Sequence, residues 1–423
     1  MAHAGIPDLA GARVAEYPRA WPTIPPMEVP VRHYPYLIVG AGMAAHAAAH
    51  ALRASDAERP IGMIGAEPTG PYKRPPLSKG LWRDEDPEGI WLGTRLPGLE
   101  LHTGRRVVTV ERGSRKVVDD RGVEYGYDKL LLATGGSPRR LPFGGGAVIH
   151  FRTVDDYRRL RSLADLRSRI AVVGGGFIGS EIAAALAMHG LEPTLIFPDE
   201  TVCARVFPRE LGTRLNALFQ ERGVRLLPGT SVTGIEDAGH DRSRVALSNG
   251  SSLQVDAVVA GIGLEPGVEL ARAAGLTLDD GVVVDESLRT SDPSIFAAGD
   301  VARFPSPLLG VSMRVEHEDA AVTMGSAAGR AMAGIPTRYD HLPFFYSDLF
   351  DLGYEAVGLT DARMEVVADW KDEYARGFLY YLEKGRVRGV VCWGIFGKLD
   401  EARALLAEPG PFRGDDLRGR LTA

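Results

Sequence analysis

Two glycine-rich segments of this chain have the residue types and spacing that bind dinucleotide phosphates. Each follows a short apolar run and precedes an alanine-rich stretch, and they start at Gly40 (Gly40-Ala41-Gly42-Met43-Ala44-Ala45) and at Gly174 (Gly174-Gly175-Gly176-Phe177-Ile178-Gly179). In this pattern the first glycine turns the chain, the second lets a pyrophosphate approach the backbone, and the third small residue lets helix pack on strand. The helix N-terminus then favours the anion. Two such fingerprints predict two bound dinucleotides, a flavin and a nicotinamide.

Strands and helices must flank both fingerprints if they are to work. For the first we expect a strand from Tyr36, a helix over Ala44–Ala54 and a strand over Ile61–Ile64. The second unit spans Arg169–Phe197, and Val224–Leu227, Val232–Ile235, Val245–Leu247 and Val255–Ala260 read as further strands of the same domain. Two more strands lead into polar or glycine-rich turns, Lys129–Leu132 before Thr134 and Ile295–Ala298 before Asp300, and a helix is predicted over Glu318–Met332.

These elements predict an α/β protein with two Rossmann-like dinucleotide-binding domains, the second inserted into the first, and a C-terminal α+β domain. After Pro336 an aromatic-rich alternation indicates an antiparallel sheet, with a last helix near Leu399–Leu406. We expect a proline-rich N-terminal arm over 1–35 and a split first domain over 36–150 and 264–340. The second domain is expected over 151–263 and the C-terminal domain over 341–423.

Composition excludes several classes of protein. The formal net charge of −6 argues against nucleic-acid binding, and the five arginines within 158–169 read as a solvated helix face. Cys203 and Cys392 are the only cysteines and form no C-x-x-C, so we expect no redox-active disulfide. The histidines show no metal-ligand spacing, and we predict no metal site. Without a signal peptide or a run of ~20 apolar residues, the expected location is the cytoplasm.

The arrangement resembles the FAD-dependent pyridine-nucleotide reductases. Within them it most resembles the apoptosis-inducing-factor branch, with NADH:ferredoxin reductases as close relatives. The resemblance covers about 33–405 and rests on six segments: Pro71–Lys79, Ala133–Arg139, Gly174–Glu181, Arg314–Asp319, Tyr346–Leu349 and Gly353–Leu359. It implies non-covalent FAD in the first domain, NAD(H) in the second and an interface domain third.

The resemblance implies a catalytic pair of Lys79 and Glu181. Lys79 ends the proline-braced loop that the family folds against the flavin, where its ammonium would donate a hydrogen bond toward N5. Glu181 follows the second fingerprint and would keep that ammonium charged and oriented. A surface lysine and a glutamate stabilised by the helix dipole are the alternative reading.

Several further residues match family positions that contact FAD. Asp300 would lie near the ribitol, and Glu67 is assigned to the adenosine ribose although Ala66 occupies the usual place. His317, the third catalytic candidate, and Tyr346 would lie near the isoalloxazine edge. A structural histidine is the alternative for His317, and the apoptosis-inducing factor carries Trp in place of Tyr346. The remaining candidates are Arg74, Thr134, Gly135, Arg152 and Gly263.

The second domain carries the nicotinamide candidates. Asp199 lies 20 residues beyond Gly179, at the end of a second strand, where a carboxylate accepts the ribose hydroxyls and repels a 2′-phosphate. It argues for NADH, although Arg205, at a position that reaches the cofactor phosphates, keeps NADPH open. Phe177 would cover the flavin face and move aside for the nicotinamide, with a plain core aromatic as the alternative.

The function that follows is hydride transfer from NADH to flavin N5, then electron transfer to a ferredoxin, a quinone or dioxygen. The alternative is a slow redox switch whose reduced flavin–NAD complex controls oligomerisation, which leaves a homodimer open. The long third-domain insertion of the apoptosis-inducing-factor branch is missing here, because Leu359 runs to Tyr380 in about 20 residues. Insertion-dependent switching is therefore disfavoured.

Overall fold

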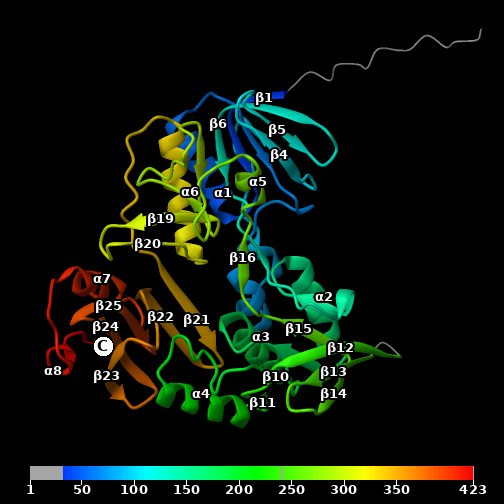
Figure 1. Cartoon of the computed structure of the whole chain (residues 1–423), viewed down its shortest axis with the longest axis vertical. Helices are drawn as coiled ribbons and strands as arrows, with labels where there is room; N and C mark the ends of the chain where they lie inside the picture. The colour runs from blue at the N-terminus through cyan, green and yellow to red at the C-terminus, as the bar shows by residue number, and fades with distance from the viewer. Residues whose placement is uncertain (1–31, 240–241, 423) are drawn as a thin grey trace, which may run out of the picture.

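The computed structural model describes residues 32–239 and 242–422. Figure 1 shows an upper part built on one large sheet and a lower part in which two further assemblies lie side by side. The chain passes from the upper part into the lower right, returns upward, and ends in the lower left. This order fits the predicted α/β architecture, in which the second unit interrupts the first.

The upper part is built on a seven-stranded sheet with strand order β3-β2-β1-β6-β5-β4, in which β18 also pairs with β6. Its strands are β1 (Arg32–Val39), β2 (Ile61–Ile64), β3 (Leu99–His102), β4 (Val107–Glu111), β5 (Lys116–Asp119), β6 (Glu124–Leu132) and β18 (Ile295–Ala297). Strand β18 runs parallel to β6 although more than 160 residues separate the two strands. The chain therefore adds the last strand of the first sheet only after it has formed the second unit.

The first strand begins earlier than predicted. β1 starts at Arg32, so residues 32–35 of the expected arm belong to the sheet, and residues 1–31 lie outside the described part of the chain. Tyr34 is buried and lies across Gly62, which has no side chain to block it. Pro35 is tolerated because β1 pairs with β2 only from Tyr36 onward.

Two helices pack closely beneath this sheet. α1 (Met43–Ser55) follows the first fingerprint, and α6 (Glu318–Met332) occupies the range predicted for it. A Cβ on Gly325 would lie 2.2 Å from the carbonyl oxygen of Ala44, and one on Gly329 would lie 2.5 Å from that of Ala48. The two glycines, one turn apart on α6, therefore let the backbone of α6 contact the backbone of α1. This contact fixes the position of α1 and, with it, of the first fingerprint.

The second unit contains a five-stranded parallel sheet with strand order β11-β10-β9-β15-β8. Its strands are β8 (Val148–His150), β9 (Ile170–Val173), β10 (Thr194–Ile196), β11 (Arg225–Leu227) and β15 (Ala257–Ala260). The helices are α2 (Val154–Asp165), α3 (Phe177–Met188) and α4 (Arg209–Glu221). Of these, α2 begins before the arginine-rich stretch that was read as a helix face, with a capping box at Thr153.

Val232–Ile235 and Val245–Leu247 form strands as predicted, in an antiparallel sheet that is separate from the parallel one and contains β12 (Val232–Gly239), β13 (Arg242–Leu247) and β14 (Ser252–Val255). One expectation for this unit is wrong in detail. The predicted strand Val255–Ala260 is divided at Asp256, whose carboxylate accepts hydrogen bonds from the backbone and guanidinium of Arg169. The polar residue thus marks the change from one sheet to the other.

The C-terminal part is an antiparallel sheet with strand order β21-β22-β25-β24-β23. The strands are β21 (Phe344–Leu349), β22 (Leu352–Gly358), β23 (Glu365–Asp372), β24 (Arg376–Glu383) and β25 (Arg386–Trp393), followed by α7 (Leu399–Ala407) and α8 (Gly414–Leu417). The predicted sheet and final helix are confirmed, but β23 was missed. That strand lies at the sheet edge and carries charged residues, so its apolar alternation is weak.

Short elements connect these parts, and one core joins two of them. The connecting elements are β7 (Gly136–Pro138), β16 (Leu264–Pro266), β17 (Val282–Val283), β19 (Ala302–Ser306), β20 (Val311–Met313) and α5 (Glu269–Ala273). A single hydrophobic cluster runs from the second unit into the C-terminal sheet, including Phe207, Tyr354 and Trp393. Within the described ranges, no helix is long and apolar enough to cross a bilayer.

Candidate active site

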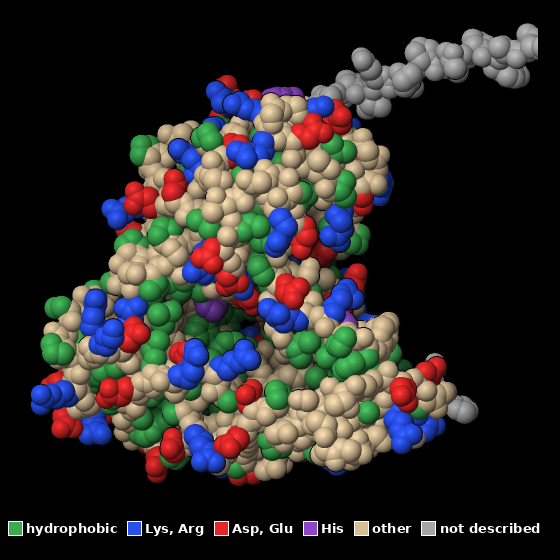
Figure 2. All heavy atoms as spheres, viewed as in Figure 1, with side chains coloured by type: hydrophobic (Ala, Val, Ile, Leu, Met, Phe, Trp, Pro, Cys, Tyr) green, Lys and Arg blue, Asp and Glu red, His purple; other side chains and the backbone are tan. Residues whose placement is uncertain are grey.

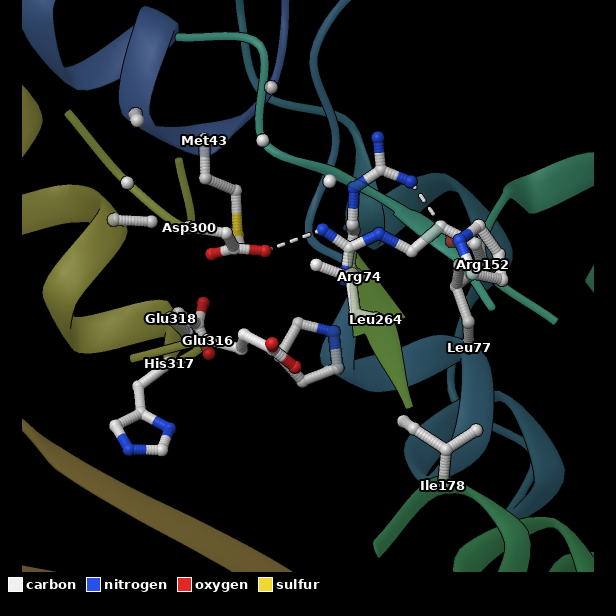
Figure 3. Close-up of a pocket in the computed structure, with 18 of the residues that line it drawn as sticks. Met43, Arg74, Leu77, Arg152, Ile178, Leu264, Asp300, Glu316, His317 and Glu318 are labelled. Atoms are coloured by element: carbon white, nitrogen blue, oxygen red, sulfur yellow. Dashed lines mark hydrogen bonds and ion pairs between the residues drawn. The ribbon is translucent and has the colours of Figure 1, made fainter. Parts of the chain in front are cut away.

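A cavity of about 590 Å³ lies where the three parts meet, within the size range of cofactor sites. Figure 2 shows this face of the molecule hollowed between its upper and lower parts, with a histidine side chain visible inside. Figure 3 looks into the cavity: Met43 and Asp300 come from the upper part, Ile178 comes from α3 below, and His317 comes from the start of α6. Both fingerprint units therefore contribute to one cavity.

The first fingerprint is shaped to hold a dinucleotide phosphate. Gly40 has a φ of +113°, and a Cβ there would lie 2.1 Å from the carbonyl oxygen of Ala133. A Cβ on Gly42 would meet no protein atom within 4 Å, so the backbone of Gly42 is open to the cavity it lines. Gly40 must therefore be glycine, because a side chain there would collide with Ala133. Gly42 instead leaves space in which a pyrophosphate can approach the backbone. Ala45 is fully buried in α1 and does not line the cavity.

The second fingerprint repeats this geometry. Gly174 has a φ of +111°, with a Cβ position 2.4 Å from the carbonyl oxygen of Gly261. A Cβ on Gly179 would lie 1.8 Å from the carbonyl oxygen of Gly174, whereas one on Gly176 would meet nothing within 4 Å. These three glycines lie outside the cavity, but Phe177 and Ile178 between them line it. The second loop therefore presents its free backbone beside the cavity and its side chains into it.

Lys79 and Glu181 form a buried ion pair in the cavity wall, as the resemblance implies. The ammonium nitrogen lies 2.7 Å from Oε2 of Glu181, whose side chain is only 3% exposed. The hydroxyls of Ser78 and Ser347 each donate to one oxygen of this carboxylate at 2.6 Å. Three donors from two other segments thus fix one carboxylate of α3, and it in turn orients the ammonium. The sequence analysis did not identify the two serines, because no sequence motif marks a serine whose hydroxyl donates to a carboxylate far away in the chain.

Aromatic side chains also line the cavity. Phe345 stacks on His317 with ring centroids 4.8 Å apart, and Phe177 packs against Phe345 at 5.3 Å. Burial lowers the pKa of His317 to about 4, so its imidazole is neutral at pH 7. Tyr346 lies at the rim with its ring 5.5 Å from the Lys79 nitrogen. This wall is apolar and carries no positive charge from histidine at neutral pH.

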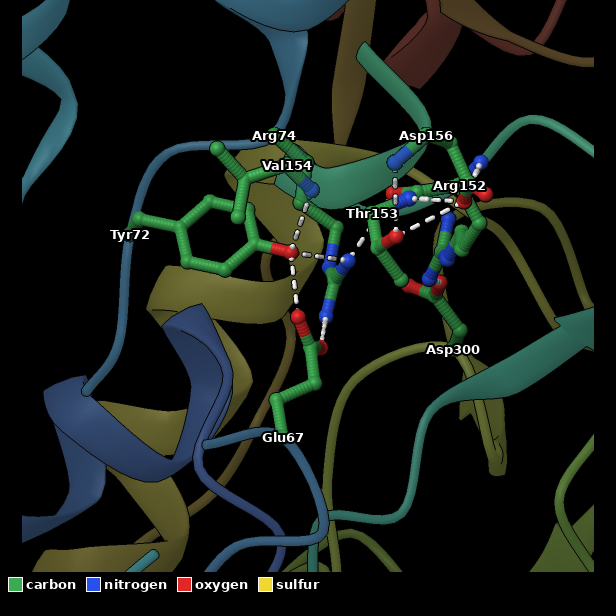
Figure 4. A network of polar contacts seen from close by, with 8 residues as sticks. All are labelled: Glu67, Tyr72, Arg74, Arg152, Thr153, Val154, Asp156 and Asp300. Carbon is green, nitrogen blue, oxygen red and sulfur yellow. Dashed lines mark hydrogen bonds and ion pairs between the residues drawn. The ribbon is translucent and has the colours of Figure 1, made fainter. Parts of the chain in front are cut away.

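A polar network connects the proline-braced loop to the far wall of the cavity (Figure 4). Arg74 donates to Glu67 at 2.6 Å, to the hydroxyl of Tyr72 at 2.9 Å and to the carbonyl oxygen of Arg152 at 2.9 Å. Tyr72 donates to the other oxygen of Glu67 at 2.6 Å. Both oxygens of Glu67 are therefore engaged, so this carboxylate holds Arg74 as well as lining the cavity.

Two further charged residues of the cavity lining form an ion pair. Arg152 donates to the carboxylate of Asp300 at 2.6 Å, and Asp300 is mostly buried in the turn that follows β18. Thr134, Gly135 and Gly263 also line the cavity. The set of a carboxylate, two guanidiniums and open glycine backbone can bind hydroxyls and phosphates together, and it fits the polar chain of FAD.

Two further predicted residues lie outside the cavity lining, in addition to Ala45 and the three glycines of the second fingerprint. Asp199 and Arg205 are both exposed in the segment that follows β10 and do not line it. Conversely, the structure adds Met43, Leu77, Glu316, Glu318 and Phe345 to the lining. Most of these directly neighbour residues named from the sequence, and that adjacency is the signal that could have identified them.

Both cysteines are free and buried, in different hydrophobic clusters. Burial raises the pKa of each thiol to about 12. No redox-active disulfide can therefore form in this fold. No group of three or more potential metal ligands occurs within residues 32–239 and 242–422.

Known proteins are similar to this chain in sequence and in fold. The sequence is 40% identical to the ferredoxin–NAD(+) reductase component of the anthranilate 1,2-dioxygenase system of Burkholderia cepacia, over 81% of this chain and 86% of that protein. It is 33% identical to apoptosis-inducing factor 1 of Dictyostelium discoideum, over 90% of this chain and 79% of that protein. The crystal structure of the covalent putidaredoxin reductase–putidaredoxin complex superposes with a TM-score of 0.82 at 32% identity, covering 89% of this chain and 93% of that one.

These matches agree with both relationships inferred from the sequence. They favour an electron-transferring oxidoreductase over the redox switch, because several ferredoxin reductases match at 34–40% identity over most of the chain. Residues 34–325 match the sequence profile described as pyridine nucleotide-disulphide oxidoreductase. The chain therefore belongs to the pyridine nucleotide-disulphide oxidoreductase family, as an FAD- and NADH-dependent oxidoreductase without a redox-active disulfide.

Proposed function

We propose that this chain oxidises NADH and delivers the electrons one at a time to a small iron–sulfur protein of the ferredoxin type. In this proposal residues 36–150 and 264–340 hold FAD, residues 151–263 hold NADH, and the C-terminal part completes the site. The observation that carries it is the single cavity, which both fingerprint units and β21 line together. A donor and an acceptor of hydride must meet in such a place.

FAD, when bound, supplies the chemistry that converts a two-electron donor into one-electron steps. The chain's own residues position and enclose it. The open backbone at Gly42 and the Arg74 and Arg152 guanidiniums would hold the polar chain of FAD, and Asp300 would accept from its hydroxyls. Lys79, held by Glu181, would supply a buried ammonium to stabilise the negative charge that develops on reduction. Phe177 would cover the flavin until the nicotinamide enters.

The ferredoxin acceptor is supported by the relatives whose names specify it, among them the Burkholderia cepacia reductase component. Anaerobic stopped-flow mixing with NADH tests the proposal, followed by addition of a [2Fe–2S] ferredoxin, a quinone or dioxygen. We expect rapid bleaching of flavin absorbance and reoxidation by the ferredoxin much faster than by the other acceptors. A persistent charge-transfer state that every acceptor reoxidises slowly would restore the redox-switch alternative.

We also propose that Asp199 makes NADH the preferred coenzyme. Its exposed carboxylate stands where ribose hydroxyls bind and would repel a 2′-phosphate. Asp199→Ala should narrow the preference for NADH over NADPH by about tenfold or more, measured as the ratio of kcat/KM values. Glu200→Ala is the matched control, because Glu200 is the residue after Asp199 and its exposed carboxylate pairs with Arg209. An unchanged ratio in Asp199→Ala would refute the assignment.

A further inference from the structure

The segment 198–207, here called the coenzyme loop, leaves β10 and carries both Asp199 and Arg205. It contains no helix or strand, yet its backbone is held from several sides. Cys203 donates its N–H to the carbonyl oxygen of Gly175 at 2.7 Å, which ties the loop to the second fingerprint. Cys203 adopts a φ of +52°, a conformation that costs free energy for a residue other than glycine. A non-glycine residue keeps this backbone conformation only where contacts with the surrounding structure hold it in place.

Helix α4 supplies a second support through one side chain. Oδ1 of Asn216 accepts the N–H of Val202 at 3.0 Å, and its Nδ2 donates to the carbonyl oxygen of Glu200 at 2.9 Å. One amide therefore satisfies two backbone groups of the loop that have no partner in regular secondary structure.

The third support comes from the C-terminal sheet, more than 150 residues further along the chain. The hydroxyl of Tyr381, a buried residue of β24, donates to the carbonyl oxygen of Val206 at 2.8 Å. The N–H of Ala362 donates to the carbonyl oxygen of Arg205 at 2.9 Å. Phe207 ends the loop with its ring edge-on to Tyr354 and Trp393, at 5.2 Å from each. Figure 1 shows the segment around α4 lying beside the strands of this sheet.

The contacts at Val206 and Arg205 set the position of the residue expected to reach the coenzyme phosphates. The side chain of Arg205 is exposed, whereas its carbonyl is bound by Ala362, in the turn between β22 and β23, and the carbonyl of Val206 is bound by Tyr381 of β24. A flexible loop would lose entropy on binding NADH, and a loop held in place beforehand loses less. The C-terminal sheet can therefore strengthen coenzyme binding without touching the coenzyme.

We propose that Tyr381 is a positioning residue for NADH: through its hydrogen bond to Val206 it holds the coenzyme loop in its binding conformation. The inference rests on the proposed function, because it takes the coenzyme loop as the NADH site. It adds a role for the C-terminal sheet in coenzyme affinity, separate from the hydrogen bond that Ser347 of β21 donates to Glu181.

Tyr381→Phe removes only the hydroxyl and tests the proposal in the full-length, FAD-loaded protein. We expect the Kd for NAD⁺ by calorimetry and the KM for NADH to rise about three- to tenfold. The flavin content, the flavin spectrum and kcat at saturating NADH should stay unchanged. Tyr380→Phe is the control, because Tyr380 is equally buried on the same strand but its hydroxyl has no hydrogen-bond partner among the described residues.

A second variant keeps the test independent of β24. Asn216→Ala removes the support from α4 and should raise the same two constants in the same direction. If the wild-type protein binds NADH and neither Tyr381→Phe nor Asn216→Ala changes KM or Kd, the positioning role is wrong. The same conclusion follows if Tyr380→Phe has as large an effect as Tyr381→Phe. A wild-type protein that does not bind NADH would overturn the proposed function and this inference together.

Discussion

At the scale of single residues, the cavity is organised around Glu181. Its carboxylate accepts from Lys79, Ser78 and Ser347, so the proline-braced loop, α3 and β21 all meet at one buried group. A buried carboxylate that lost all its partners would be strongly destabilising. The two serines mean that Glu181 still accepts two hydrogen bonds when the ammonium is removed.

This arrangement predicts a specific result for Lys79→Ala. We expect the rate of flavin reduction by NADH to fall by at least about tenfold, because the ammonium no longer faces the developing charge. The free energy of unfolding should fall by about 1–3 kcal/mol, less than the 3–5 kcal/mol typical of a stranded buried charge, because the serines remain. Stopped-flow absorbance and urea unfolding measure the two effects.

The control for this variant is a lysine in an ion pair far from the cavity. Lys116→Ala removes the ammonium that pairs with Glu124 at 2.9 Å on the surface of the first sheet. It should leave both the reduction rate and the stability close to wild type. A Lys79→Ala protein whose reduction rate and flavin spectrum match wild type would show that the ammonium does not act on the flavin.

His317 predicts how stability depends on pH. Burial lowers its pKa in the folded protein to about 4, whereas an unfolded histidine titrates near 6.5. Between these pH values the unfolded state binds more protons than the folded state, so the free energy of unfolding should fall as the pH drops from 6.5 to 4. Above pH 6.5 the imidazole is neutral in both states, and this loss of stability is absent. His317→Phe, which keeps the stacking on Phe345, should flatten this slope, a change on the order of 1–3 kcal/mol over the window.

Urea unfolding at half-unit pH steps would measure this slope in the wild type and in His317→Phe. His33→Gln is the control, since His33 is exposed and pairs only with Asp128. Equal slopes in wild type and His317→Phe would show that His317 is not kept neutral by burial.

At the scale of elements, local patterns determined which segments became strands and helices near the fingerprints. The order of apolar run, glycine turn and alanine-rich helix predicted most of α1, because this pattern depends on neighbouring residues alone. The helix predicted over Glu318–Met332 is α6. The edge strand β23 and the break at Asp256 were missed, because each depends on a partner elsewhere: β24 in one case and Arg169 in the other. Strand ends are decided by such partners more often than by propensity.

Packing of α6 on α1 gives a prediction at this scale. Gly325→Ala places a Cβ 2.2 Å from the carbonyl oxygen of Ala44, so the helices must separate. We expect a loss of about 1–3 kcal/mol of stability and less bound FAD per chain, because α1 carries the first fingerprint. Thermal unfolding and the ratio of flavin to protein absorbance measure these. Gly113→Ala, where a Cβ meets nothing within 4 Å, should change neither; equal behaviour of the two variants would contradict the packing argument.

At the scale of the whole molecule, three parts that are distant in sequence close around one cavity. One hydrophobic cluster joins the second unit to the C-terminal sheet, and Cys203 lies in it, whereas Cys392 lies in the cluster behind that sheet. Each thiol is therefore shielded by a core that opens only when the chain unfolds extensively. The cytoplasmic location expected from the sequence stays a prediction, and so does the homodimer that the sequence left open.

Thiol reactivity tests this view of the molecule. Burial raises both thiol pKa values to about 12, so neither thiol is ionised or accessible at pH 8 in the folded protein. A disulfide reagent such as DTNB should react with both cysteines only as the protein unfolds in urea, with one common midpoint. Rapid reaction of either thiol in native buffer would show that its cluster opens separately.

The sequence by itself determined the two nucleotide-binding units, their order and the family, because glycine turns and strand–helix alternation are local in the chain. With the family resemblance it also placed Lys79 opposite Glu181. Only the tertiary structure decided what surrounds that pair: Ser347 reaches Glu181 from β21, Phe345 stacks on His317, and Tyr381 supports the coenzyme loop. These contacts join residues that no local pattern relates, and they form only when burial of the shared core brings the three parts together.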